Sequence, residues 1–311
     1  MSGGRGREAA AAFEAYLGVR SRLPAAGFGR GWRSAESLSE IAGPFDLVLL
    51  DAYGVLNVGD SPIPGAAEAI AALRAAGKSV AVVSNSAAYP KRVMMQRYAR
   101  LGFDFAPEEV VTSREALLAH LARAPRLRWG AMMNPGYGME DFESIDVSFL
   151  GDDPAAYAEA EGFLLVGTDG WTETRQSLLE AALRAHPRPV VVGNPDIVAP
   201  RETGLSLEPG HFAHLLADAA GIAPVFLGKP FAEIYRLALH QLAPKLAPER
   251  VLMVGDTLHT DILGGRQMGF STSLVTGHGA LVGLDPAVAI RRSGIVPDFV
   301  IRSIGTAPCR G

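Results

Sequence analysis

The 311-residue sequence has little cysteine and no excess of basic charge. Its one cysteine, Cys309, excludes an intramolecular disulfide and a cysteine zinc cluster, which fits a reducing cytoplasm. With 29 basic and 33 acidic residues, the net charge of -4 predicts no nucleic-acid partner and no polybasic membrane anchor. No apolar run approaches the roughly 18 residues that span a bilayer, and Glu8 and Glu14 interrupt the N-terminal alanines where a signal peptide would be apolar. We therefore expect a cytoplasmic protein that does not associate with membranes.

Short apolar runs, each followed by a small or acidic residue, recur along the chain. The runs are Leu47 to Leu50, Val80 to Val83, Phe163 to Val166, Val190 to Val192 and Val251 to Val254. A strand that is apolar throughout is typical of a parallel sheet covered on both faces. The segments between these runs often begin with proline and end at glycine or proline, as helices do. This alternation predicts an α/β fold, and 48% apolar residues are enough to bury its core.

The length of 311 residues favours two domains over one. The segment over 114–200 has strand and helix signals of its own, so we predict a second domain inserted into the first. The core of the first domain then comprises 44–113 and 201–311. Residues 1–43 are less regular, and we predict that they form an N-terminal helical arm without a catalytic role.

Polar residues that are candidates for chemistry follow three of these runs and one further short apolar run, at the edge where open parallel sheets bind ligands. Asp51 follows Leu50 directly, as a candidate for chemistry or as a plain turn residue. Ser84 and Asn85 follow another strand, where they can hold a phosphate or cap a helix. Lys229 follows a run over 225–227, where it would place a charge beside an anion or lie in solvent.

Two further aspartates, Asp256 and Asp261, lie around the turn that follows Val254. With Asp51 they would form an oxygen-rich cluster, which suits Mg²⁺ because that cation prefers hard oxygen ligands. Taken alone, Asp256 can equally be a turn residue and Asp261 an acid in the first turn of a helix. The order aspartate, serine, lysine and paired aspartates turns these weak signals into a strong one.

In this order the residues resemble the haloacid dehalogenase (HAD) superfamily of phosphatases, in which an aspartate is the nucleophile. Two segments are similar to motifs of subfamily IIA, namely Gly193 to Asp196 and Gly255 to Ile262. This branch contains nitrophenylphosphatase, pyridoxal phosphatase and NagD-like phosphatases. The resemblance covers about Phe45 to Ile304. It implies a Rossmann-like parallel-sheet core with an inserted α/β cap domain of type C2, subtype A. We place this cap at 114–200.

The same resemblance implies a Mg²⁺-dependent phosphomonoester hydrolase that forms an aspartyl-phosphate on its nucleophile. The implied catalytic residues are Asp51 and Lys229. The implied phosphate-binding residues are Ser84, Asn85 and Lys229. The implied metal ligands are Asp51, Asp256, Asp261 and the backbone carbonyl of Tyr53. In the cap, Asn194 and Asp196 are candidates for contacts that select the substrate. The expected partners are a small phosphorylated metabolite and, through the cap, a second copy of the chain in a homodimer.

The sequence departs from the family at residue 53, where most of these phosphatases have a second aspartate for acid/base catalysis. A phenol is a poor proton acceptor at neutral pH. Tyr53 therefore puts in doubt the contribution of acid/base catalysis, which raises the rate by about 10²- to 10⁴-fold. Three interpretations stay open: Tyr53 is the acid, another group such as His259 replaces it, or turnover is slow and favours good leaving groups. His259 can also be a solvent-facing loop residue.

A phospholigand-binding protein with little or no hydrolase activity is the alternative to the enzyme, and Tyr53 is its main support. Against this alternative, the nucleophile, the lysine and the metal carboxylates are all present. A dinucleotide-binding oxidoreductase is disfavoured, because the segment from Asp51 to Gly54 lacks the glycine fingerprint that such proteins have after their first strand.

Overall fold

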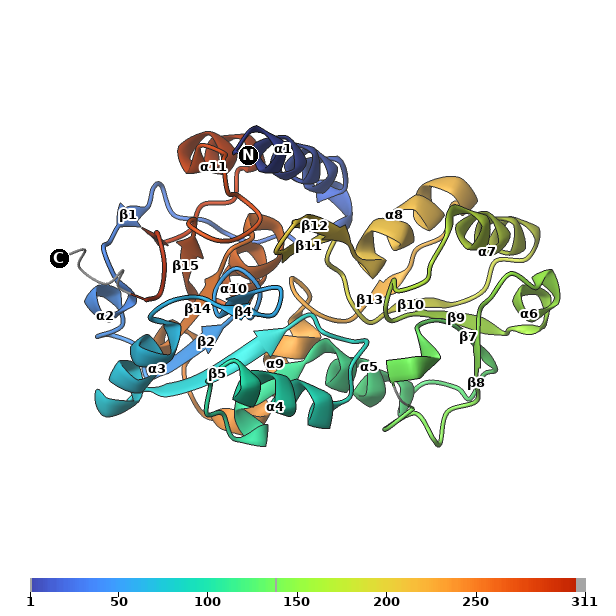
Figure 1. The fold of residues 1–311 in the computed structure, drawn as a ribbon, viewed down its shortest axis with the longest axis horizontal. Helices are drawn as coiled ribbons and strands as arrows, with labels where there is room; N and C mark the ends of the chain where they lie inside the picture. The colour runs from blue at the N-terminus through green and yellow to red at the C-terminus, as the bar shows by residue number, and fades with distance from the viewer. Residues whose placement is uncertain (1, 138, 306–311) are drawn as a thin grey trace.

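The computed structural model describes residues 2–137 and 139–305, in which two parallel sheets lie side by side (Figure 1). Cys309 lies outside the described residues. The first sheet has seven strands in the order β1-β16-β15-β14-β2-β5-β6, and all neighbours are parallel. These strands are β1 (Arg33–Ser34), β2 (Leu47–Leu50), β5 (Ser79–Ser84), β6 (Val110–Thr112), β14 (Val251–Gly255), β15 (Ser271–Val275) and β16 (Phe299–Ile301).

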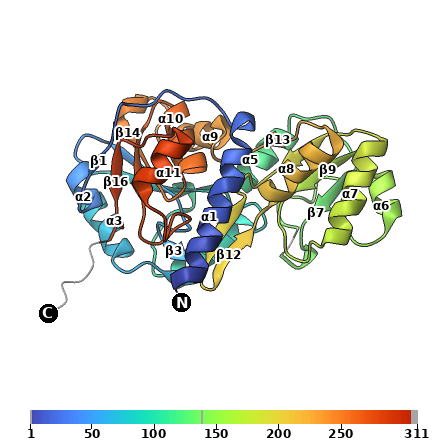
Figure 2. The same cartoon turned by 90° about the horizontal axis from the view of Figure 1, so that it is seen from above.

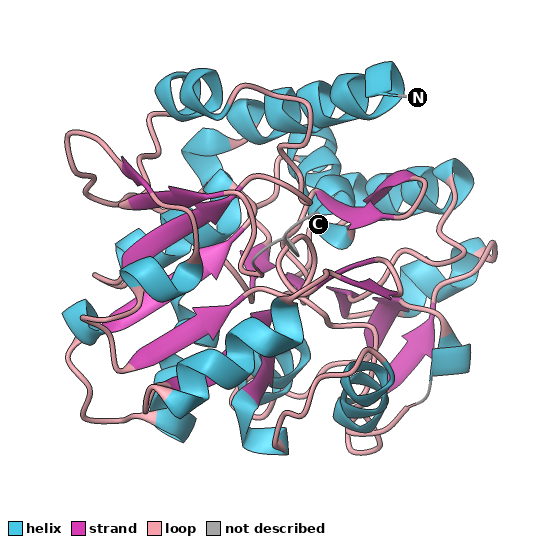
Figure 3. Ribbon diagram, turned by 60° about the vertical axis from the view of Figure 1, so that its left-hand side comes forward, coloured by secondary structure: helices cyan, strands magenta, loops and turns pink. Residues whose placement is uncertain are grey.

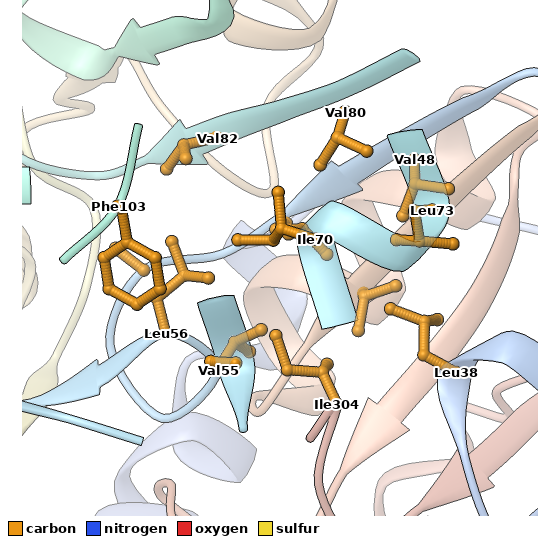
Figure 4. Close-up of a cluster of buried hydrophobic side chains, with 14 of the residues drawn as sticks. Leu38, Val48, Val55, Leu56, Ile70, Leu73, Val80, Val82, Phe103 and Ile304 are labelled. Atoms are coloured by element: carbon orange, nitrogen blue, oxygen red, sulfur yellow. The ribbon is translucent and has the colours of Figure 1, made fainter. Parts of the chain in front are cut away.

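Helices cover both faces of the first sheet (Figure 3). The helices around it are α1 (Ser2–Gly18), α2 (Leu38–Ile41), α3 (Ala66–Ala75), α4 (Lys91–Arg100), α5 (Ser113–Leu121), α9 (Ala232–Leu242), α10 (Leu263–Gln267) and α11 (Pro286–Ser293). On one face, Ile70 of α3 packs in the same cluster as Val48 and Val82 (Figure 4). On the other face, Leu49 belongs to a cluster with Tyr235 of α9. Alternate residues of β2 therefore face two different cores, which is why this strand is apolar throughout.

The second sheet has five parallel strands in the order β13-β10-β9-β7-β8. They are β7 (Trp129–Met132), β8 (Val147–Phe149), β9 (Gly162–Leu165), β10 (Val190–Val192) and β13 (Val225–Phe226). Its helices are α6 (Pro154–Glu159), α7 (Glu173–Ala185) and α8 (Pro209–Ala220). Leu165 and Val192 pack on this helical layer, whereas Leu164 and Val191 join the cluster that contains α5. Helix α5 thus connects the two sheets through packing.

Two short antiparallel hairpins complete the strands. They are β3 (Asn57–Val58) with β4 (Ser61–Pro62), and β11 (Val198–Arg201) with β12 (Gly204–Leu207). The shorter helical turns are η1 (Arg20–Arg22), η2 (Pro107–Glu109), η3 (Pro135–Tyr137), η4 (Pro248–Arg250) and the π-helical η5 (Leu258–Ile262). Both hairpins lie near the carboxyl end of β2, because β3 begins six residues after Asp51 and Arg201 of β11 contacts Tyr53.

The predicted α/β class with a parallel Rossmann-like core is confirmed, and each predicted apolar run forms or overlaps a strand. The division into arm, core and cap remains a proposal. In the structure the second sheet continues to β13, which lies past the proposed cap boundary at residue 200, and β1 at 33–34 joins the first sheet. Within residues 2–137 and 139–305, no helix has the length and apolar character needed to cross a membrane.

Candidate active site

The carboxyl ends of three neighbouring strands bring the predicted residues to one place. Strands β5, β2 and β14 lie next to one another and run in the same direction, so Ser84, Asp51 and Asp256 emerge at the same edge of the sheet. All three line a cavity of about 350 Å³, together with Asn85 and Asp196. The second sheet closes this cavity from the other side, because Asp196 follows β10.

Lys229 lies beneath the cavity as a buried cation. Its side chain is 2% exposed, and its Nζ lies 2.5 Å from Oδ1 of Asp51 and 2.8 Å from Oδ1 of Asp261. Burial alone would lower the pKa of Lys229, but the carboxylates of Asp261 and Asp51 outweigh burial and raise it well above the usual value. The lysine is therefore positively charged at neutral pH, beside the predicted nucleophile.

Asn85 fixes both the lysine and the loop from the second sheet. Its Oδ1 accepts a hydrogen bond from the backbone N–H of Lys229 at 2.7 Å. Its Nδ2 donates to the backbone carbonyl of Lys229 at 3.0 Å and to Oδ1 of Asp196 at 2.8 Å. The side chain of Asn85 is thus occupied by protein groups, and only its backbone remains as a candidate contact for a phosphate.

Three buried carboxylates form a compact acidic group. Asp51, Asp256 and Asp261 each place an oxygen within 4.8 Å of the other two. Oδ2 of Asp256 accepts the backbone N–H of Ala280 at 2.7 Å, and Oδ2 of Asp261 accepts that of Thr257 at 3.1 Å. These bonds hold the carboxylates in place at the end of β14 and in η5.

Electrostatics make this acidic group suited to a divalent cation. Burial raises the pKa of Asp51 to about 7, with Lys229 opposing and Asp261 adding to the rise. Burial, followed by the charges of Asp51 and Asp261, raises the pKa of Asp256 well above its usual range. One lysine therefore does not compensate three buried carboxylates. A hard divalent cation with oxygen ligands would supply the missing positive charge, so these residues fit Mg²⁺.

Two family models match the chain. One, described as haloacid dehalogenase-like hydrolase, matches residues 48–144, and the other, described as HAD-hydrolase-like, matches residues 226–307. The rat protein named haloacid dehalogenase-like hydrolase domain-containing protein 2 is 30% identical over 229 residues, which cover 73% of this chain and 83% of that protein. The chain belongs to the haloacid dehalogenase superfamily.

Two further proteins that the chain resembles are named or described as phosphatases. Human glycerol-3-phosphate phosphatase is 29% identical over 303 residues, which cover 87% of this chain and 92% of that enzyme. A solved structure from Cytophaga hutchinsonii, described as a possible sugar phosphatase of the HAD superfamily, superposes with a TM-score of 0.78 at 24% identity, covering 89% of this chain and all of that one. The protein is a HAD phosphatase of subfamily IIA, a hydrolase of phosphoric monoesters.

Tyr53 is held between two arginines. Its hydroxyl accepts hydrogen bonds from Arg97 of α4 and, at 3.1 Å, from Arg201 of β11. The two guanidinium carbons lie 4.9 Å and 5.0 Å from the centre of its ring. Arg201 in turn pairs with Glu208 at 3.0 Å. The phenolic oxygen is therefore occupied as an acceptor of cationic donors.

His259 is buried and is not among the residues that line the cavity. The ring is 1% exposed and stacks on Tyr16 of α1, with centroids 5.1 Å apart and an interplanar angle of 9°. The alternative prediction of a solvent-facing loop histidine is wrong, because α1 covers this turn. Thr257 and Thr260 of the same segment line the cavity, whereas His259 packs behind it against Tyr16 and Phe13.

The two predicted specificity residues differ in their surroundings. Asp196 lines the cavity and accepts a hydrogen bond from Asn85, and burial raises its pKa well above the usual value. Asn194 also lines the cavity, but its side chain is occupied: it donates to Glu208 at 3.1 Å and accepts the backbone N–H of Asp196 at 2.9 Å. Asn194 therefore shapes the loop that presents Asp196, and a specificity role for either stays a prediction.

Proposed function

We propose that this HAD phosphatase hydrolyses the phosphomonoester of a small metabolite, with Mg²⁺, through an aspartyl-phosphate on Asp51. The observation that carries the proposal is the buried contact of Asp51 with Lys229, beside the carboxylates of Asp256 and Asp261, with Asp51 and Asp256 lining one cavity. A volume of about 350 Å³ suits a small ester. A cytoplasmic location and a homodimer, both expected from the sequence, complete the proposal.

The chemistry follows from what surrounds the nucleophile. An oxygen of Asp51 forms a bond to phosphorus as the bond from phosphorus to the leaving oxygen breaks. The leaving oxygen takes a proton from solvent and departs as the alcohol. Water then attacks phosphorus and loses a proton to solvent as the bond between phosphorus and Asp51 breaks, which releases inorganic phosphate and restores the carboxylate. Lys229, the hydroxyl of Ser84 and the backbone N–H of Asn85 would neutralise the transferring phosphoryl oxygens. Burial of the lysine strengthens this contribution, because its charge is poorly screened by water.

Mg²⁺ would be held by carboxylates that the fold already brings together. The proposed ligands are Asp51, Asp256, Asp261 and the backbone carbonyl of Tyr53. When bound, the ion supplies positive charge against the phosphoryl oxygens. Gly54 and Gly279 let the backbone approach Asp256 closely, since a Cβ at either position would collide with its carboxylate.

Phosphate release should depend strictly on Mg²⁺. We expect the native protein to release phosphate from p-nitrophenyl phosphate and from a panel of metabolite monoesters in Mg²⁺, and to lose this activity in EDTA, because the buried carboxylates would then lack their counter-charge. Calorimetry should show Mg²⁺ binding that Asp256→Asn weakens. Failure to release phosphate from any ester, with Mg²⁺ and a phosphate ligand still bound, would favour the phospholigand-binding alternative.

Turnover should depend steeply on the leaving group. Tyr53 is a phenol rather than a carboxylic acid, so we expect weak general-acid catalysis at the leaving oxygen, and aryl esters should react about 10²-fold faster than alkyl esters. Tyr53→Asp should raise the alkyl rate more than the aryl rate, whereas Tyr53→Phe should change both alike. A selective loss of the alkyl rate in Tyr53→Phe would instead identify the phenol as the acid. The measurement is kcat for p-nitrophenyl and glycerol phosphates.

A further inference from the structure

The N-terminal helix α1 packs against two segments that carry active-site carboxylates. Phe13 and Tyr16 contact His259 of η5, the turn that also contains Asp261. Tyr16 also belongs to a buried cluster with Ile197, which directly follows Asp196. Figure 2 shows α1 running alongside β12 and α11, and α1 contacts β12 directly. The arm therefore joins the motif around Asp261 to the loop from the second sheet.

Tyr16 makes the polar contact at this junction. Its side chain is buried, and its hydroxyl accepts the backbone N–H of Ile197 at 3.1 Å. The neighbouring Asp196 accepts a hydrogen bond from Nδ2 of Asn85. Oδ1 of the same Asn85 side chain accepts the backbone N–H of Lys229. An unbroken series of short contacts thus runs from the arm to the lysine beside the nucleophile.

Two ion pairs of the arm lie at the surface. Glu14 pairs with Arg292 of α11 at 2.6 Å, and Arg22 pairs with Asp218 of α8. Exposed ion pairs of this kind contribute little, because water screens them. A buried N–H without its acceptor is costly. Loss of the hydrogen bond to the Tyr16 hydroxyl should therefore cost more free energy than loss of either exposed ion pair.

We propose that Tyr16 is a positioning residue, which holds the Asp196 loop against η5 so that Asn85 and Lys229 are fixed for phosphate binding. This inference rests on the proposed function and gives the N-terminal arm a role that the sequence did not indicate. Tyr16 does not touch the cavity, so it acts through Ile197 and Asp196. Its loss should weaken binding of the phosphoryl group more than it slows the reaction of bound ester.

Tyr16→Phe tests the inference, because it keeps the ring on His259 and removes only the hydroxyl. We expect KM for p-nitrophenyl phosphate to rise about tenfold, with a smaller change in kcat, because the unpaired N–H of Ile197 lets the loop shift. The dissociation constant of inorganic phosphate, measured by calorimetry in Mg²⁺, should rise by the same factor. Glu14→Gln, which breaks only an exposed pair, should change neither quantity.

A second variant separates positioning from stability. Phe13→Leu weakens packing on the same histidine but keeps the Tyr16 hydroxyl, so it should lower the melting temperature and leave phosphate affinity unchanged. A Tyr16→Phe protein with a lower melting temperature but native KM and phosphate affinity would overturn the proposal. If the native protein hydrolyses no ester, the proposed function fails, but the phosphate titration still decides whether Tyr16 positions the site.

A double-mutant cycle tests the route through Asp196. If Tyr16 acts through this loop, Tyr16→Phe should add little to the loss of phosphate affinity caused by Asp196→Ala, which removes the acceptor for Asn85. Independent, additive losses would show that the hydroxyl does not work through Asp196 and would overturn that step.

Discussion

Asp51→Asn is expected to reduce Mg²⁺-dependent phosphate release by about 10⁴-fold or more, the scale seen when hydrolases lose their nucleophile. The amide has nearly the same shape as the carboxylate but cannot attack phosphorus or form the acyl-phosphate. The measurement is phosphate release from p-nitrophenyl phosphate at saturating ester. Asp46→Asn is the matched control, because Asp46 precedes the same strand β2 but pairs at the surface with Arg250 at 2.6 Å. It should leave the rate unchanged.

The Asp51→Asn variant should remain folded. Lys229 keeps its 2.8 Å contact with Asp261, and removal of one of three crowded carboxylates relieves repulsion among them. Its melting temperature in EDTA should therefore equal or exceed that of the native protein. A folded variant that still turns over within about tenfold of the native rate would rule out an aspartyl-phosphate on Asp51.

The sheet could be predicted from the sequence because burial on both faces leaves a local signature. Val48 and Leu50 face one core and Leu47 and Leu49 the other, so the strand has no polar side. The strand ends could be predicted for the same reason, since Asp51 comes immediately after this apolar run. Parallel neighbours then bring Ser84 and Asp256 to the same edge without any further information from the sequence.

The surroundings of Tyr53 and His259 could not be predicted, because they depend on contacts between distant parts of the chain. Arg201 is 148 positions from Tyr53 in the sequence. No local pattern around Arg201 indicates that its side chain lies beside Tyr53. Tyr16 is 181 positions from Ile197. A polar turn residue such as His259 is expected to be exposed unless the helix that covers it is known. The sequence therefore predicts which residues gather at the strand ends, but not the residues that pack behind them.

Lys229→Met should destabilise the metal-free protein by about 3–5 kcal/mol, the usual result of removing one partner from a buried ion pair. The ammonium group is 2% exposed and lies against both Asp51 and Asp261, and methionine fills a similar volume without the charge. Urea denaturation in EDTA measures the loss. Lys78→Met is the control, because that partly exposed lysine donates to the backbone carbonyl of Gly43 and pairs with no buried carboxylate in the described part of the chain, so it should change stability little.

The pH dependence of this variant identifies the cause of its instability. Lys229 opposes the rise in the pKa of Asp51, so without it Asp51 should hold its proton to still higher pH in the folded state than in the unfolded state. A folded-state pKa above the unfolded value means that stability increases as pH falls toward about 4. Lys229→Met in EDTA should therefore regain stability in acid, and Mg²⁺ at neutral pH should do the same by replacing the lost charge. A deficit independent of both pH and Mg²⁺ would mean that lost packing, rather than uncompensated carboxylates, destabilises the fold.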